Sequence, residues 1–403
     1  MRIGKRMARA LLVSSVVPWA AWFAPSPVLA QQPVKIGVLM SYTGPLAVNG
    51  IRATDGVRLF FQSKNWEVAG RKIELVREDT EAKPDVSLTK TQKVVERDKV
   101  HALIAYISTP ETYASRDYIT AQKIPTIVVS GANALVHPGS PQRSPYMFRI
   151  YNSLYGNAKA LAEWVYQKEG HKRVVLVALN FGGAVEPAFA FKTTLQRLGG
   201  RVVTELKPPL GTADWAPWIA QIGAAASNAD AVVAYVYSAD SIRMVKGWKE
   251  FGLEGKVPLY GGEGVLSEML LQAMGDAAEG LRQFGSYCPT LKTPENQILA
   301  QLVKTTGEYP AEYNYYGWSA AQTMWEALKS IGGRVEDKDG LVKALEQIRY
   351  VGAMGPFRYD ANHNPILDVY MQEVRRLGGE LHNVCLGKVP EVGHPGDIPF
   401  PPN

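Results

Sequence analysis

Short apolar runs alternate with amphipathic stretches along most of the chain. In its first part, runs rich in branched apolar residues predict β-strands at residues 34–39, 72–76, 102–106 and 126–129. Between the first two runs, apolar residues recur at the spacing of one helix face from Ala53 to Phe61. Strands that alternate with helices are typical of parallel sheets built from βαβ units.

The same alternation begins again after residue 150. A regular apolar stripe from Ala158 to Tyr166 predicts a helix that ends at Gly170. The continuous apolar run 174–178 is expected of a strand buried on both faces. Further strands are predicted at residues 201–203, 231–235 and 257–260. Two such series predict an α/β fold of two doubly wound, Rossmann-like lobes.

The first thirty residues have the parts of a secretory signal peptide. Basic residues within 2–9 precede an apolar stretch at 10–23, and small residues at Val28 and Ala30 suit signal peptidase. A membrane anchor is the alternative, but the stretch contains Pro18 and is shorter than the roughly 20 apolar residues that a span needs. We therefore predict cleavage after Ala30 and export of the mature chain.

Without this leader the chain is nearly neutral. The full sequence has a formal net charge of +6, and four of these charges lie in the predicted signal peptide. A balance this small gives no support for binding to nucleic acid. Residues 31–403 are too long for one compact core, so two domains are expected.

Cys288 and Cys385 are the only cysteines in the sequence. In an oxidising compartment they could form a disulfide, provided that the fold brings them together. The sequence alone leaves open whether they are bonded or free.

The usual signatures of enzymes are missing from the sequence. It has no phosphate-binding P-loop, no nucleophile elbow and no dinucleotide-binding glycine motif after the first strand. The six histidines lack the spacing of a metal site. We therefore predict no catalytic residue, no metal and no cofactor.

The turns that follow the predicted strands are rich in hydroxyl groups and glycine. In doubly wound sheets ligands bind beyond the carboxyl ends of the strands, and these turns lie at 41–45, 108–112 and 130–133. Hydroxyl and backbone N–H groups near helix N-termini can hold a carboxylate. The alternative is that these residues only cap helices and form turns.

In the second part of the chain, Glu263 lies in a glycine-rich turn after a predicted strand. Such a carboxylate is well placed to meet the ammonium group of a ligand, or else it is a solvated loop residue. The turns at 180–182 and 235–240 occupy equivalent positions.

Taken together, these segments resemble the type I periplasmic binding proteins of the leucine/isoleucine/valine-binding family, which serve branched-chain amino-acid ABC importers. The resemblance runs from about residue 34 to 388. It rests on the segments Lys35–Val38, Thr43–Pro45, Ser108-Thr109, Arg149-Ile150, Gly261–Val265, Glu279-Gly280 and Met354–Phe357.

The resemblance implies two lobes that close on a ligand about three crossover segments, near 148–151, 281–286 and 357–360. Lobe one would comprise 33–149 plus 284–356, and lobe two 150–283 plus 357–390. Residues 391–403 are rich in proline and are interpreted as an extended or loose tail.

The resemblance also implies a set of ligand-binding residues. In lobe one, these are Ser108 with its neighbour Thr109, and Ser130 with Ala132. The family usually has threonine at the position of Ala132, so Ser130 is expected to supply the hydroxyl group. In lobe two and the returning segment, the implied residues are Phe181, Tyr237, Glu263 as the acid that binds an ammonium group, and Tyr313, with Tyr315 or Tyr316 as alternatives.

The implied function is that of a monomeric periplasmic protein that captures an amino acid or similar small carboxylate and delivers it to the permease subunits of an ABC importer. Ala132 and the aromatic cluster from Tyr313 to Trp318 depart from a branched-chain binder. The same fold binding an aromatic acid, an amide or a urea-like solute is therefore an alternative. A ligand sensor and a secreted enzyme are two others.

Overall fold

The computed structural model describes Met1 and residues 32–399. Apart from Met1, the predicted signal peptide lies outside the described residues, and so does the end of the Pro-rich tail from residue 400. Within residues 32–399, no helix has both the length and the apolar character that a membrane span requires.

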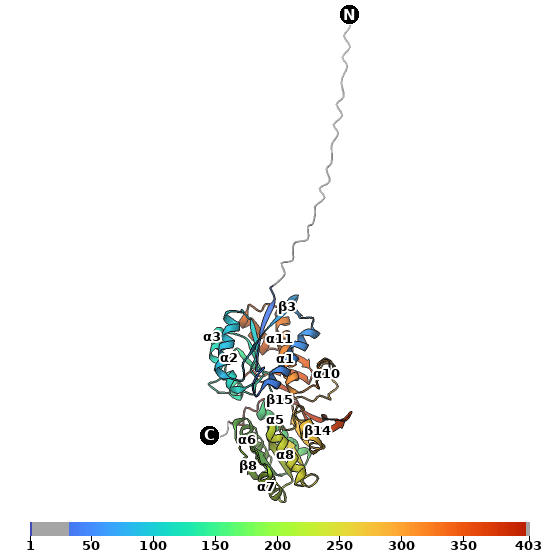
Figure 1. Ribbon diagram of the computed structural model, residues 1–403. Helices are drawn as coiled ribbons and strands as arrows, with labels where there is room; N and C mark the ends of the chain where they lie inside the picture. The colour runs from blue at the N-terminus through green and yellow to red at the C-terminus, as the bar shows by residue number, and fades with distance from the viewer. Residues whose placement is uncertain (2–31, 400–403) are drawn as a thin grey trace. The chain divides into compact units, whose positions relative to one another are not determined.

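Two sheets divide the described chain into two α/β lobes (Figure 1). Lobe one contains a six-stranded sheet in the order β2-β3-β1-β4-β5-β6. Its strands are β1 (Val34–Met40), β2 (Glu67–Val68), β3 (Arg71–Asp79), β4 (Ala102–Ala105), β5 (Thr126–Val128) and β6 (Met147–Arg149). Its helices are α1 (Ala47–Ser63), α2 (Pro84–Glu96), α3 (Thr109–Gln122), α4 (Asn133–Val136), α10 (Pro294–Lys304), α11 (Glu312–Ser330) and α12 (Lys338–Glu346).

Lobe two contains a nine-stranded sheet in the order β12-β13-β14-β11-β10-β9-β7-β8, with β15 paired to β14. Its strands are β7 (Arg173–Ala178), β8 (Arg201–Leu206), β9 (Ala231–Tyr235), β10 (Leu259–Gly261), β11 (Arg282–Gly285), β12 (Arg349–Gly352), β13 (Gly355–Tyr359), β14 (Pro365–Leu377) and β15 (Glu380–Val392). Its helices are α5 (Leu154–Glu163), which continues as a π-helix (Trp164–Lys168), α6 (Gly182–Arg197), α7 (Ala216–Ala226), α8 (Ser238–Glu250), α9 (Leu271–Met274) and a 3₁₀ turn (Gly275–Ala277).

The predicted strands and their parallel pairing are confirmed in both lobes. In lobe one, Ile36 of β1 lies between Leu75 of β3 and Ala102 of β4. In lobe two, β7 runs parallel to β8 and β9. The apolar run in β7 is fully buried from Val174 to Ala178, as expected for a strand covered on both faces.

The pattern of the sequence does not predict the antiparallel strands at the end of the chain. β14 pairs antiparallel with β11 on one side and with β15 on the other. β12 lies in the range expected for lobe one, but it pairs with β13 in the sheet of lobe two. The chain passes between the two sheets after β6, after β11 and after α12.

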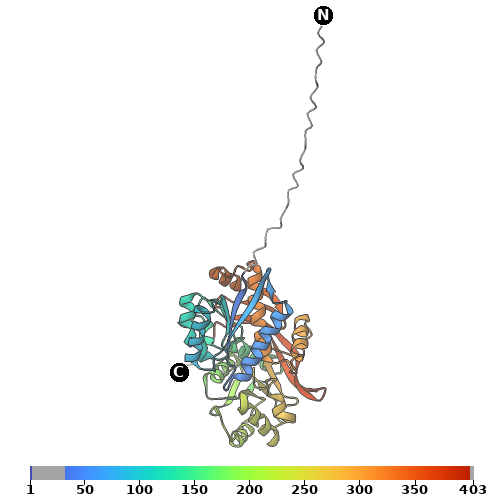
Figure 2. The same cartoon turned by 45° about the horizontal axis from the view of Figure 1, so that its top comes forward.

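Helix α11 packs against α1 although the two are far apart in the sequence (Figure 2). A Cβ atom at Gly317 would lie 1.8 Å from the carbonyl oxygen of Ala53. One at Gly56 would lie 2.1 Å from the carbonyl oxygen of Asn314. Only glycine at these two positions allows the helix backbones to approach so closely, which fixes α11 in lobe one.

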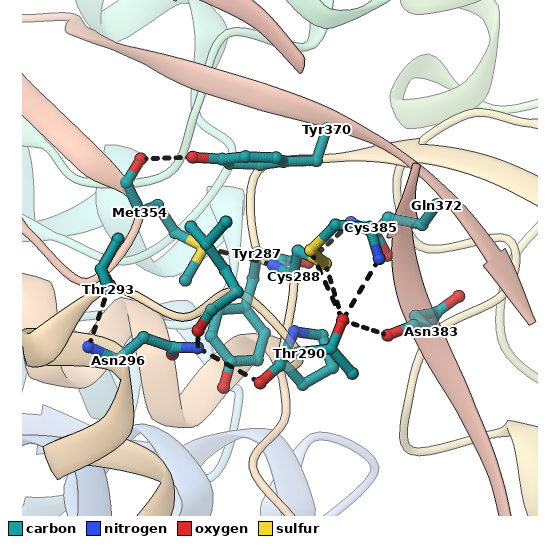
Figure 3. Close-up of a disulfide and its surroundings, with 12 residues drawn as sticks. Tyr287, Cys288, Thr290, Thr293, Asn296, Met354, Tyr370, Gln372, Asn383 and Cys385 are labelled. Atoms are coloured by element: carbon teal, nitrogen blue, oxygen red, sulfur yellow. Dashed lines mark hydrogen bonds between the residues drawn. A yellow bond between two sulfur atoms is a disulfide. The ribbon is translucent and has the colours of Figure 1, made fainter. Parts of the chain in front are cut away.

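Cys288 and Cys385 form a disulfide, which answers the question that the sequence leaves open (Figure 3). Their Cα atoms are 6.0 Å apart, and the bond joins the segment after β11 to β15. Thr290 lies beside it and accepts a hydrogen bond from the backbone N–H of Cys385 at 3.2 Å.

The described part of the Pro-rich tail packs against the body of the protein, so it is not loose over residues 393–399. Ile398 is fully buried. Asp397 forms an ion pair with Arg197 of α6 at 2.5 Å. The ring of His394 stacks on that of Tyr155 with 5.3 Å between their centroids.

Replacing both cysteines by alanine is expected to lower the free energy of unfolding by about 2–5 kcal/mol, because the disulfide restricts the unfolded chain. The bond closes a loop between residues that are 97 positions apart, so the effect should lie near the upper end of this range. Denaturation with guanidinium chloride measures it. Reductant should shift the wild-type curve in the same direction and leave the double variant unchanged. Superimposable curves for the wild type and the double variant would contradict the prediction.

Candidate functional site

A cavity of about 880 Å³ lies at the carboxyl ends of the parallel strands of both sheets. This is the position at which doubly wound sheets bind ligands. Both lobes line it, through the loops and helix starts that follow β4, β5, β7, β9 and β10, together with the start of α11. The lining residues are Asn49, Thr109, Pro110, Tyr113, Gly131, Asn133, Ala134, Tyr151, Leu154, Phe181, Gly182, Gly183, Glu186, Tyr237, Ser238, Ala239, Ile242, Glu263, Gly264, Ser267, Met269, Leu270, Glu312, Tyr313 and Tyr316.

Five of the eight predicted site residues line this cavity: Thr109, Phe181, Tyr237, Glu263 and Tyr313. The other three come from the predicted loops but have other partners or positions. This result places the residues without testing what they bind.

Ser108 is the N-cap residue of α3 and does not line the cavity. Its hydroxyl donates to the Oε2 atom of Glu111 at 2.6 Å, and its backbone N–H donates to the same atom at 2.9 Å. This arrangement is a capping box, so the capping alternative describes Ser108 well. Thr109, the next residue, reaches the cavity wall.

The loop 130–133 reaches the cavity through residues other than the two predicted ones. The hydroxyl of Ser130 is buried and bonds to that of Thr112 at 2.7 Å, and Ala132 is fully buried. Gly131 and Asn133 line the cavity instead.

Two helices of lobe two begin at the cavity with aromatic N-cap residues. Phe181 precedes α6 and Tyr237 precedes α8, and in the described structure neither side chain caps its helix. Their rings are 6.0 Å apart and nearly perpendicular. The first residues of both helices therefore bring backbone N–H groups and the positive end of the helix dipole to the cavity wall.

Glu263 is a buried carboxylate that meets neutral donors. Its Oε1 atom accepts hydrogen bonds from the hydroxyl of Tyr316 at 2.6 Å, and from the hydroxyl and backbone N–H of Ser286 at 2.5 and 3.2 Å. Its Oε2 atom accepts one from the amide of Asn157 at 3.0 Å. The predicted acid is thus part of the cavity wall, held on the side of the crossover after β11.

Three tyrosine rings stand around this carboxylate. The ring of Tyr316 lies 4.7 Å from that of Tyr151 and 5.6 Å from that of Tyr313, the latter nearly perpendicular. Burial raises the pKa of Tyr313 to about 12. Burial, and then the charge of Glu263, also raise the pKa values of Tyr151 and Tyr316, so all three keep their hydroxyl protons at neutral pH.

Asn133 connects a buried cation in lobe one with a carboxylate in lobe two. Arg149 in β6 is fully buried and donates to the Oδ1 atom of Asn133 at 2.6 Å and to the carbonyl oxygen of Gly131 at 2.6 Å. The amide of Asn133 then donates to the Oε2 atom of Glu186 in α6 at 2.6 Å. Burial lowers the pKa of Arg149 to about 10, so the guanidinium stays charged and fixes the orientation of this amide.

Glu312, the first residue of α11, also connects the lobes, but here the carboxylate belongs to lobe one and the donors belong to lobe two. Its carboxylate accepts hydrogen bonds from the backbone N–H of Glu268 at 3.0 Å and from the hydroxyl of Ser267 at 3.2 Å, both in lobe two. Burial raises the pKa of Glu312 to about 7. Burial also raises the pKa of Glu186.

Glu186, Glu263 and Glu312 therefore share one property: each accepts a hydrogen bond from a neutral donor of the other lobe. Among the described residues that line the cavity, none is Lys, Arg or His. The sequence pattern does not predict a role for Glu186 or Glu312. Asn133 lies in the turn 130–133 that the pattern indicates, but it is not among the predicted site residues.

Residues 32–399 contain no group of three or more His, Cys, Asp or Glu side chains that could hold a metal ion. The polar groups of the cavity are hydroxyls, amides, backbone N–H groups and carboxylates. Such a set recognises an organic solute by charge and hydrogen bonding.

Comparison with known proteins agrees with this architecture. The model of the periplasmic binding protein family matches residues 33–379. The Leu/Ile/Val-binding protein homolog 6 of Brucella melitensis is 25% identical over 371 residues, which cover 90% of this chain and 93% of the relative.

Solved structures extend the similarity to the fold. An ABC transporter substrate-binding protein from Sphaerobacter thermophilus is 32% identical, with a TM-score of 0.85 and coverage of 90% of this chain and 99% of its own. A solute-binding protein of an ABC transporter from Rhodopseudomonas palustris BisB5, solved with 3,4-dihydroxybenzoic acid, is 27% identical, with a TM-score of 0.80 and coverage of 91% and 99%. The chain therefore belongs to the type I periplasmic binding proteins of the Leu/Ile/Val-binding family, the solute-binding components of ABC transporters.

Proposed function

We propose that the protein captures an amino-acid zwitterion in the periplasm and delivers it to the permease subunits of an ABC importer. The observation that carries this proposal is the pairing, in one cavity, of the buried acid Glu263 with two helix N-termini whose first N–H groups have no side-chain cap. A negative site and a positive site in one cavity suit a solute that carries both charges. Export by the predicted signal peptide and action as a monomer belong to this proposal.

The carboxylate of the solute is assigned to the helix starts. Backbone N–H groups at a helix N-terminus hold an anion without a basic side chain. Gly182 and Gly183 at the start of α6 and Ser238 and Ala239 at the start of α8 line the cavity. Thr109 adds a hydroxyl from lobe one.

The ammonium group of the solute is assigned to Glu263. A buried ammonium must meet a fixed negative partner, since removing it from water otherwise costs several kcal/mol or more. Glu263 supplies the charge, and the tyrosine rings beside it exclude water.

In this proposal, the three carboxylates that accept hydrogen bonds across the cleft help to hold the two lobes closed. When the lobes separate, Glu186, Glu263 and Glu312 lose partners from the other lobe and regain water. Opening and closing therefore exchange one set of hydrogen bonds for another, and a bound solute can shift the equilibrium with few contacts. The closed form presents both lobes to the permease.

An aromatic carboxylate is a second candidate solute. Aromatic rings form much of the cavity wall: Tyr113, Tyr151, Phe181, Tyr237, Tyr313 and Tyr316. The similar protein from Rhodopseudomonas palustris BisB5 was solved with 3,4-dihydroxybenzoic acid. For such a solute, Glu263 would accept a hydrogen bond from a ring hydroxyl.

Removing the acid tests the proposed ammonium site. Glu263→Ala is expected to weaken the binding of amino-acid zwitterions at least tenfold, corresponding to about 1.4 kcal/mol or more, because the buried ammonium loses its negative partner. Isothermal titration with a panel of amino acids measures this, and the exposed Glu254→Ala is the matched control. If Glu263→Ala binds as tightly as the wild type, the assigned role of Glu263 is wrong.

A thermal-shift screen separates the two candidate solutes, because a ligand of the folded state raises its stability by mass action. An amino-acid receptor is expected to show a higher Tm with amino acids and an unchanged Tm with benzoate and hydroxybenzoates. The reverse pattern would establish the aromatic carboxylate as the solute.

The pKa of Glu312 predicts a pH dependence of stability. Because this pKa is about 7 in the folded protein and its ordinary value is 4.5, folding favours the protonated form. The stability that protonated Glu312 adds to the folded protein is fully present below pH 4.5 and is lost as the pH rises through 7.

Urea denaturation of the wild type and of Glu312→Gln at about pH 5 and about pH 8 measures this contribution. The free energy of unfolding of the wild type, relative to that of Glu312→Gln, is expected to fall between these pH values by on the order of 2 kcal/mol. The partly exposed Glu308→Gln serves as control. If the difference in the free energy of unfolding between the wild type and Glu312→Gln is the same at both pH values, the raised pKa of Glu312 is wrong.

A further inference from the structure

We infer that the amine of the solute is fully alkylated, so that the zwitterion carries a quaternary ammonium group. This inference rests on the proposed function and narrows the class of solute. It follows from the hydrogen-bond acceptors, the charge and the aromatic rings that the cavity wall around Glu263 presents to a cation.

The hydrogen-bonding capacity of Glu263 is nearly exhausted within the protein. A carboxylate has about four acceptor positions. The Oε1 atom already accepts from Tyr316 and twice from Ser286, and the Oε2 atom accepts from Asn157. One position at most is left for the N–H groups of a ligand.

All of these donors are neutral, so the negative charge of Glu263 is not compensated by a cation. None of the described lining residues is basic, and two further carboxylates, Glu186 and Glu312, line the same cavity. The wall therefore attracts positive charge while offering few acceptors for N–H groups. A quaternary ammonium has this combination of properties, because it carries a full charge and no N–H group.

The aromatic rings beside Glu263 supply the contacts that such a cation needs. The rings of Tyr313 and Tyr316 are 5.6 Å apart at 88°, and Tyr151 lies 4.7 Å from Tyr316 at 39°. All three tyrosines line the cavity, so a solute beside Glu263 meets aromatic surface from more than one ring. Quaternary ammonium groups are recognised by such aromatic cages.

A primary ammonium would fit this part of the cavity less well. It has three N–H groups, and a buried donor without an acceptor is unfavourable. Alkylation removes these donors and adds apolar surface that the tyrosine rings can cover.

The experiment compares three ligands that share a side chain and a carboxylate and differ only in the group at the position of the amine. Leucine, N,N,N-trimethyl-leucine and the carbon isostere of the latter, in which a tert-butyl group replaces the trimethylammonium group, are titrated into the mature protein. We expect trimethyl-leucine to bind roughly tenfold tighter or better than both others, because only it has both the charge and the alkyl surface.

The possible results separate the inference from the proposed function. If leucine binds as tightly as trimethyl-leucine or tighter, the inference is wrong and the amino-acid proposal stands. If the carbon isostere binds as tightly as trimethyl-leucine, the cavity does not recognise the positive charge of the solute, and the inference is wrong. If none of the three binds and benzoate does, both proposals are overturned.

Three variants and one control test the aromatic cage formed by Tyr151, Tyr313 and Tyr316. Tyr313→Phe keeps the ring and is expected to keep the preference for trimethyl-leucine, whereas Tyr313→Leu removes the ring and should reduce the preference at least severalfold. Tyr316→Phe keeps the ring but frees an acceptor position on Glu263, so leucine should gain affinity relative to trimethyl-leucine. Tyr118→Leu, at a residue that does not line the cavity, controls for the change of residue type. Circular dichroism checks that each variant is folded. If the ratio of the affinities for trimethyl-leucine and leucine is the same in all variants, the proposed role of the tyrosine rings is wrong.

Discussion

A carboxylate that is removed from water must meet hydrogen-bond donors, and this requirement connects the two lobes. Glu186 and Glu263 of lobe two accept from lobe one, while Glu312 of lobe one accepts from lobe two. Because the donors are neutral, these contacts satisfy hydrogen bonding without neutralising charge. The same contacts can thus hold the lobes together and leave the charge of Glu263 without a cationic partner.

The position of α11 makes this arrangement possible. The close approach of Gly56 and Gly317 fixes the helix against α1, far from its neighbours in sequence. Its first turns then reach the cavity, where Glu312, Tyr313 and Tyr316 line the wall. Two glycines in the core of lobe one therefore determine where three residues of the candidate site lie.

Much of the fold could be predicted from the sequence, because buried parallel strands require continuous apolar runs. The antiparallel strands β14 and β15 carry mixed side chains and escaped this pattern. The turn after β10 placed Glu263 at the cavity. Ser108 and Ser130 turned to partners within lobe one, because a hydroxyl beside a helix start finds donors and acceptors close by. The bond between Asn133 and Glu186 joins different lobes, and the pattern of a single segment carries no information about such a contact.

The aromatic N-cap residues Phe181 and Tyr237 have a consequence for the empty protein. Helices commonly begin with a residue whose oxygen caps the first N–H groups, and replacing such a cap by a residue without it lowers stability by about 1 kcal/mol. α6 and α8 begin without this help. Under the proposed function, the carboxylate of the solute serves as the missing cap for both helices. The solute would then satisfy N–H groups at the starts of two helices of lobe two, and the loaded protein would have helix starts that are capped where those of the empty protein are not.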